Sequence, residues 1–132
     1  MTTKEEVIRY CLTLPGAYED YPFDPFTPCM RHRDNHRIFA LIMEREGRIQ
    51  VNVKCSPEWI LFWREAFDAV IPGFHMNKKH WNTIILNGTV PKKDICRMIA
   101  ESYDLTGNSA KGKKKKPADG EAQAGSGKGG AG

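Results

Sequence analysis

The spacing of apolar residues predicts that the chain opens with a helix. Thr3 and Glu6 form a capping-box pattern, in which each side chain bonds the backbone of the other residue. Pro15-Gly16 then marks the end of the helical pattern. The apolar positions between these signals follow helical spacing and are Val7, Ile8, Cys11, Leu12 and Leu14.

Three strands are predicted after a loop. The stretch from Tyr18 to Pro28 holds three prolines and four aromatics, so it is expected to be extended or looped. Strands follow at about 29–33, 37–43 and 48–55, with turns at 34–35 and 44–47. The third alternates cleanly, so its polar face is expected to see water: Arg48, Gln50, Asn52 and Lys54. Residues 38–43 are apolar throughout, as expected of a central strand covered on both sides.

The second half of the chain predicts a helix, two strands and a final helix. Ser56 and Pro57 open the first of these helices as cap and first residue. Its apolar face comprises Trp59, Ile60, Phe62, Trp63, Ala66 and Phe67. Short strands are expected at 74–75 and 81–86, and Thr89 is expected to cap the last helix, with Pro91 in its first turn. The order α-β-β-β-α-β-β-α indicates an α+β fold, a two-layer domain with helices packed on an antiparallel sheet.

Composition divides the chain into a folded domain and a tail. Residues 107–132 contain Gly, Ala, Lys and Ser but no large apolar residue, so they are predicted to be disordered, and 1–106 form the domain. The net charge is +4, yet residues 1–106 carry 14 basic and 14 acidic groups, so all the excess lies in the tail. Any anion-binding surface on the folded part must therefore be local.

Several classes of function find no support in the sequence. The chain has no G-x-S-x-G, P-loop, G-x-G-x-x-G or H-E-x-x-H motif, so we expect a non-enzymatic protein without a cofactor. No apolar run approaches the roughly 18 residues of a membrane span, and the N-terminus is polar, so a cytoplasmic protein is expected.

The cysteines and the loop carboxylates are weaker candidates for chemistry. The four cysteines are widely spaced, which favours buried free thiols over disulfides or a metal site. Cys29, His32 and His36 lack an evident fourth ligand. The adjacent acids Glu19 and Asp20 would support catalysis only if they shared a cleft with His75 or His80.

The stretch 72–83 has the densest set of groups able to bind an anion. Lysines offer charge to phosphates, asparagines can bond phosphates or base edges, and aromatics can stack on bases. Purely structural roles remain open for these residues. Trp81 could be a core residue, Lys78-Lys79 a solvated turn, and the histidines hydrogen-bond partners of the backbone. The polar candidates are His75, Asn77, Lys78, Lys79, His80 and Asn82.

Five segments together resemble the MmcQ/YjbR family over nearly all of residues 5–106. They are Leu14-Pro15-Gly16, Glu19-Asp20-Tyr21-Pro22-Phe23, Val53-Lys54-Cys55, the run from Ile71 to Thr83, and Ser102-Tyr103-Asp104-Leu105. The resemblance implies a compact α+β fold and DNA binding through a double-wing arrangement. It also implies a binding surface made by the candidates above, joined by Lys54 on the third strand.

Two hypotheses for function follow. In the first, the 75–82 segment acts as a DNA-binding wing and the lysine-rich tail is a nonspecific tether. In the second, the same groups receive a protein partner or a small anion, with no nucleic-acid role.

Overall fold

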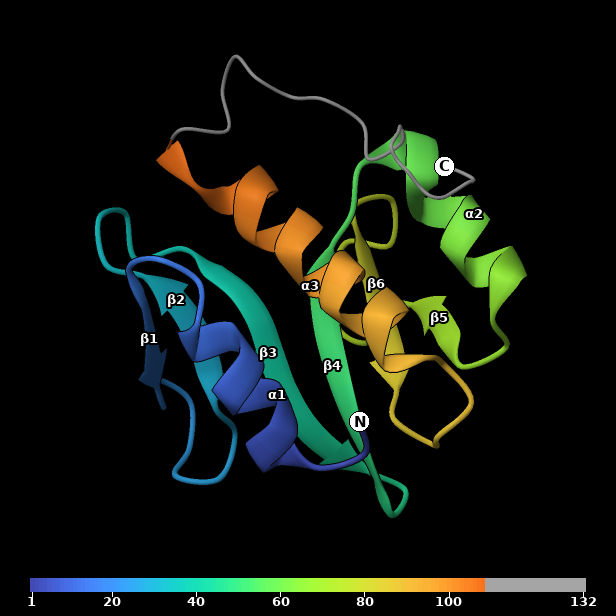
Figure 1. Cartoon of the computed structure of the whole chain (residues 1–132), viewed down its shortest axis with the longest axis horizontal. Coiled ribbons are helices and arrows are strands. Elements are labelled where there is room, and N and C mark those ends of the chain that lie inside the picture. Colours follow the sequence, from blue (N-terminus) through green and yellow to red (C-terminus); the bar gives the residue numbers. More distant parts are fainter. Residues whose placement is uncertain (109–132) are drawn as a thin grey trace.

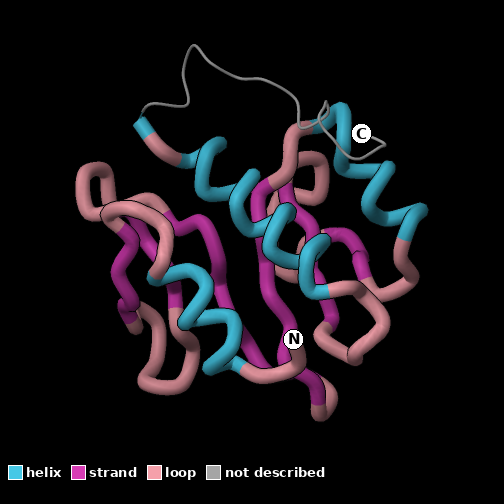
Figure 2. Tube along the Cα trace, in the orientation of Figure 1, coloured by secondary structure: helices cyan, strands magenta, loops and turns pink. Residues whose placement is uncertain are grey.

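A single antiparallel sheet with helices on one side forms the body of the protein. The computed structural model describes residues 1–108, which hold three helices and six strands (Figures 1 and 2). In chain order the elements are α1 (Lys4–Leu12), β1 (Ala17–Asp20), β2 (Cys29–His32), β3 (Ile38–Arg45), β4 (Arg48–Lys54), α2 (Pro57–Ala66), β5 (Val70–Pro72), β6 (Trp81–Ile85) and α3 (Lys92–Thr106).

The strand order in the sheet is β1-β2-β3-β4-β6-β5, and every neighbouring pair is antiparallel. Helix α3 packs on β3 and β4, α2 on β5 and β6, and α1 beside β1, all on the same face (Figure 1). The predicted two-layer α+β fold is confirmed. The structure adds one strand, β1, in the stretch predicted to be extended or looped; its residues precede Pro22, so they can pair with β2.

Two element boundaries differ from the prediction for local reasons. The expected strand at 74–75 is instead β5, which ends at Pro72; as an edge strand it tolerates a residue without an N–H. Helix α3 has Pro91 rather than Thr89 at its cap position. The Thr89 hydroxyl donates to Asn87 Oδ1 at 2.6 Å instead, closing the turn before the helix.

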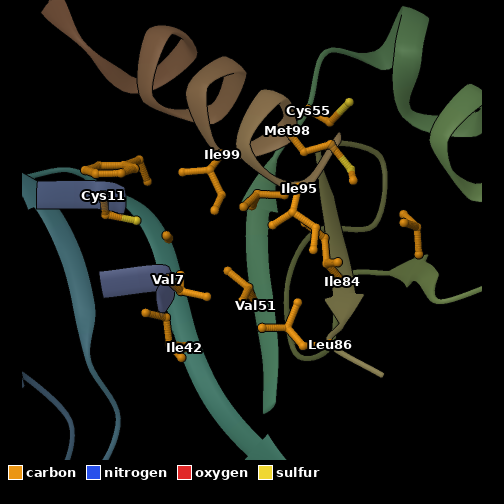
Figure 3. Close-up of a cluster of buried hydrophobic side chains, with 14 of the residues drawn as sticks. Val7, Cys11, Ile42, Val51, Cys55, Ile84, Leu86, Ile95, Met98 and Ile99 are labelled. Atoms are coloured by element: carbon orange, nitrogen blue, oxygen red, sulfur yellow. The ribbon is translucent and has the colours of Figure 1, made fainter. Parts of the chain in front are cut away.

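The core lies between the sheet and the helices (Figure 3). Val7 from α1 and Ile99 from α3 meet Ile42 and Val51 from the sheet, and all four side chains are fully buried. The cysteines are free thiols: Cys11, Cys29 and Cys55 are buried and Cys96 is half-buried. No helix in residues 1–108 is long and apolar enough to cross a membrane.

Strands β3 and β4 part at one end, and a helix side chain fills the gap. Their ladder runs from Arg45–Arg48 to Leu41–Asn52 and stops there. Continuing that register would place Phe39 opposite Lys54. Instead, the Lys54 amide donates to Ser102 Oγ at 2.8 Å, and the same hydroxyl donates to the Phe39 carbonyl at 2.7 Å. The Ser102 hydroxyl of α3 thus bridges two backbone groups, on β4 and β3, at the point where the strands no longer pair with each other.

The helix-free face of the sheet differs from the prediction in two respects. Leu41 and Met43 on β3 are only half-buried, because helices cover one face of this strand and not both. Conversely, Gln50 and Asn52 on β4 were predicted to see water, yet they are 2% and 1% exposed. What buries Asn52 is the loop that carries most of the predicted site.

Candidate functional site

Residues 73–80, here called the basic loop, fold back across the helix-free face of the sheet. The Phe74 amide donates to Thr83 Oγ1 at 2.9 Å, and the Thr83 hydroxyl donates to Asn52 Oδ1 at 2.5 Å. Asn52 Nδ2 returns a bond to the Phe74 carbonyl at 3.1 Å, closing a ring of three hydrogen bonds. Asn52 and Thr83 are cross-strand partners on β4 and β6, so the ring ties the loop to the middle of the sheet.

A close backbone approach forms the entry to the basic loop. The Gly73 amide donates to the Trp81 carbonyl at 3.0 Å. A Cβ on residue 73 would lie 2.8 Å from the Trp81 Cβ and 3.0 Å from its carbonyl oxygen, which is closer than such atoms pack. Glycine is therefore required where the chain turns from β5 into the loop.

On the other face of the sheet, Arg64 of α2 holds the far end of the basic loop. Arg64 Nε donates to Asn82 Oδ1 at 2.7 Å, and its Nη2 donates to the Lys78 carbonyl at 2.5 Å. Asn82 is fully buried and donates to the Ile60 carbonyl at 3.4 Å. The predicted site residue Asn82 thus faces the helices and supports the loop from behind. Its alternation with Ile84 was a sequence signal for that orientation.

The β3–β4 hairpin also reaches the basic loop, through an arginine not among the predicted site residues. The Arg45 guanidinium lies over the Phe74 ring, with Cζ 3.6 Å from the ring centroid. Arg45 Nη1 also donates to Gln50 Oε1 at 2.8 Å, which accounts for the burial of Gln50. A stacked guanidinium of this kind fixes both the ring and the charge.

The remaining predicted residues lie on or beside the loop surface. His75, Asn77, Lys78 and Lys79 are exposed, whereas His80 and Lys54 are half-buried. His75 adopts a left-handed backbone with φ of 59°, and Lys78 Nζ donates to the Gly73 carbonyl at 2.9 Å. Lys54 pairs across the strands with Trp81. Within residues 1–108, no carboxylate forms an ion pair with Lys54, Lys78 or Lys79.

The acidic pair is far from this loop. Glu19 and Asp20 lie on the edge strand β1, and three strands separate β1 from β6 in the sheet. At about 4.8 Å per strand, that places them on the order of 19 Å from the loop side. Asp20 pairs with Arg31 at 2.8 Å, and Glu19 accepts a bond from the Tyr21 hydroxyl. Glu19 and Asp20 therefore share no cleft with His75 or His80.

The histidines near Cys29 also have other roles. His32 Nε2 bonds Thr106 Oγ1 at 2.9 Å, and burial lowers the pKa of His32. His36 Nδ1 lies 3.0 Å from the Tyr18 hydroxyl. In the described part of the chain, no group of three or more His, Cys, Asp or Glu side chains is arranged to hold a metal ion.

Comparison with known proteins identifies the family. The model of the YjbR family matches residues 12–105. This chain belongs to the YjbR family. The match covers β1–β6, most of α3 and the whole basic loop.

Relatives of this YjbR-family protein span nearly the same domain. Escherichia coli YjbR is 32% identical over 114 residues, covering 86% of this chain and 95% of that protein. Bacillus subtilis YyaQ is 32% identical over 118 residues, covering 80% of this chain and 99% of the relative. The crystal structure of Deinococcus radiodurans DR2400 superposes with a TM-score of 0.75 at 32% identity, covering 87% and 84% of the two chains. A Pseudomonas syringae crystal structure gives 0.70 at 28% identity, covering 80% and 99%.

Proposed function

We propose that this YjbR-family protein binds DNA, with the basic loop as the contact surface. The observation that carries the proposal is the contrast between the backbone and the side chains of the loop. Its backbone is held by the buried side chains of Asn52 and Thr83 and by the half-buried Arg64, whereas His75, Asn77 and Lys79 are exposed side chains. Lys78 is also exposed, and its Nζ lies against the Gly73 carbonyl at the loop surface. A surface that is already ordered loses less entropy on binding.

The chemistry of the exposed groups suits a phosphate backbone. Two adjacent lysines supply charge, and asparagine and histidine side chains supply directional hydrogen bonds. Lys54 extends the cationic surface along β4, next to Trp81. Contacts of this kind position a duplex without reading its sequence. The tail lysines lie outside the described residues and are proposed only as a nonspecific tether.

The alternative function is a site for a small anion or for an acidic group on a protein partner. The observation that favours it is the balance of 14 basic and 14 acidic groups in residues 1–106. A duplex presents a long track of charge, whereas the basic loop covers one short stretch of the surface.

The deciding experiment is a salt titration of the full chain with a fluorescent DNA duplex. Replacing Lys78 and Lys79 by alanine is expected to weaken binding and to reduce the salt slope by about 2, since two phosphate contacts are lost. The matched control is alanine at Lys92 and Lys93, an adjacent exposed pair at the start of α3. The control is expected to leave the slope unchanged.

A second variant separates the loop from the tail. Serine in place of the four lysines at 113–116 is expected to lower affinity and reduce the slope by up to about 4, while leaving binding that still depends on Lys78 and Lys79. If this tail variant loses all measurable binding, the tail alone explains the affinity. Inorganic phosphate that raises the melting temperature of wild type, with no duplex binding, would instead support the small-anion site.

A further inference from the structure

Helix α2 packs on β5 and β6 (Figure 1), and it carries two large apolar side chains that are exposed to solvent. Leu61 is 58% exposed and Phe62 is 44% exposed. They form one stripe with Glu58 and Glu65, because residues three, four and seven apart share a helix face. The sequence pattern placed Phe62 on the core side, but Ile60 and Trp63 take that role.

The exposed Phe62 ring is held in place by its aromatic neighbours. It lies edge-on to Trp59 with centroids 5.0 Å apart, and edge-on to Trp63 at 5.2 Å. Trp63 is 2% exposed and stacks in turn on Phe67 at 6.3 Å. An aromatic ring that is anchored in this way needs little further ordering to bind a partner.

Carboxylates surround this apolar pair. Glu58 and Glu65 lie at the two ends of the stripe, and Asp68 follows just beyond the helix. Within residues 1–108, Glu65 and Asp68 form no ion pair. The one basic residue of α2, Arg64, is turned inward to Asn82 and Lys78. The outer face of α2 is therefore apolar in the middle and negative at its rim.

We propose that the outer face of α2 docks a basic amphipathic helix of a partner protein. Apolar side chains of the partner would cover Leu61 and Phe62, and its lysines or arginines would meet Glu65 and Asp68. The same negative rim repels nucleic acid and anionic lipid. The surface is thus distinct in chemistry from the basic loop, and the inference does not depend on DNA binding.

The size of the surface sets the expected strength. A helix of ten residues is about 15 Å long and supports an interface at the small end of the known range. Binding in the micromolar range or weaker is therefore expected, with Phe62 as the anchor, because aromatic residues dominate such contacts.

The test uses the full chain and two synthetic peptides of about 18 residues, one of leucine and lysine and one of leucine and glutamate, each with leucines at helical spacing. Calorimetry is expected to detect the lysine peptide and not the glutamate peptide. Phe62→Ser and Glu65→Lys are each expected to weaken binding about tenfold or more. Glu65→Lys changes only an exposed side chain, so it reports on docking even if Phe62→Ser disturbs the fold.

Matched control variants on α1 test whether peptide binding is specific to α2. Leu12→Ser removes an apolar side chain that is 48% exposed, and Glu5→Lys reverses an exposed acid. Both are expected to leave peptide binding unchanged. Equal losses of peptide affinity in the α1 and α2 variants would overturn the proposal. The peptide would then be responding to the overall charge and hydrophobicity of the protein and not to the outer face of α2. Self-association of the full chain that Phe62→Ser abolishes would also overturn it, by naming a second copy as the occupant.

Discussion

Glu101 shows how burial changes the chemistry of one side chain. It lies on α3 against Cys55, whose thiol donates to Glu101 Oε1 at 3.8 Å. Burial raises the pKa of Glu101 to about 7, and the hydrogen bond from the Ser56 backbone and the nearby Arg97 only partly offset this. Burial likewise raises the pKa of the Cys55 thiol, so the thiol is neutral near pH 7, whereas the Glu101 carboxyl changes its charge in that range. Burial therefore favours the protonated form of the Glu101 carboxyl in the folded protein.

A pH dependence of stability follows from the Glu101 carboxyl. Its contribution is fully present below its ordinary pKa of 4.5 and is lost as pH rises through about 7, because the unfolded chain releases the proton first. Glutamine mimics the protonated form, so Glu101→Gln is expected to be more stable than wild type at pH 8, by on the order of 1–3 kcal/mol.

Urea denaturation at pH 5 and pH 8 measures this difference. The control is Glu5→Gln, an exposed position on α1. Wild type that loses no more stability than Glu101→Gln between the two pH values would show that the Glu101 carboxyl is ionised in the folded state.

The basic loop and strands β4 and β6 act as one element, because polar groups join them. In an ordinary two-layer sheet the helix-free face is solvated. Here the ring of Phe74, Thr83 and Asn52 replaces water, and each member satisfies another. A ring of this kind is stable only when complete, since a buried polar group without a partner is costly.

Removing one hydroxyl from the ring tests this coupling. Thr83→Val keeps the shape of the side chain but leaves the Phe74 amide and the side-chain Oδ1 of Asn52 without these partners. The variant is expected to lose about 1–3 kcal/mol of stability, and the Phe74 amide is expected to exchange with deuterium faster. Thr2→Val, at an exposed N-terminal position, is the control. Unchanged exchange at Phe74 would mean that the loop is held by Gly73 and Arg64 alone.

Across the whole molecule, one serine links the helix layer to the sheet. Ser102 is fully buried and stands between the Lys54 amide and the Phe39 carbonyl where β3 and β4 part. The split lets α3 lie close to both strands, and Phe39 contacts both His32 and Tyr103. This gives a physical role to the first residue of the Ser102–Leu105 segment that resembled the family.

Removing the Ser102 hydroxyl is expected to lower the stability of the fold strongly, although only one atom is lost. Ser102→Ala leaves two buried backbone groups unpaired and is expected to cost on the order of 2–4 kcal/mol in chemical denaturation. The control is Ser56→Ala, because the Ser56 hydroxyl is buried without a hydrogen-bond partner in the described residues. Ser56→Ala is expected to be neutral or slightly stabilising. Similar losses from both variants would indicate a packing effect rather than the hydrogen bonds.

Local sequence patterns predicted most of the helices and strands of this protein. The capping box at Thr3 and Glu6 forms as predicted, because it needs only residues three apart. The alternation along β4 correctly divided its residues between two faces. Apolar spacing placed three helices and most strands, and five short segments, of which 71–83 is the most distinctive, indicated the family.

Only the tertiary structure decided which surfaces are covered and which groups meet. Alternation shows that Asn52 and Lys54 share a face, but burial of that face depends on a loop more than twenty residues away folding over Asn52. The stacking of Arg45 on Phe74 and the inward turn of Asn82 toward Arg64 likewise depend on strand register and helix placement. Such contacts join residues that are distant in the chain, so no periodicity in the sequence records them.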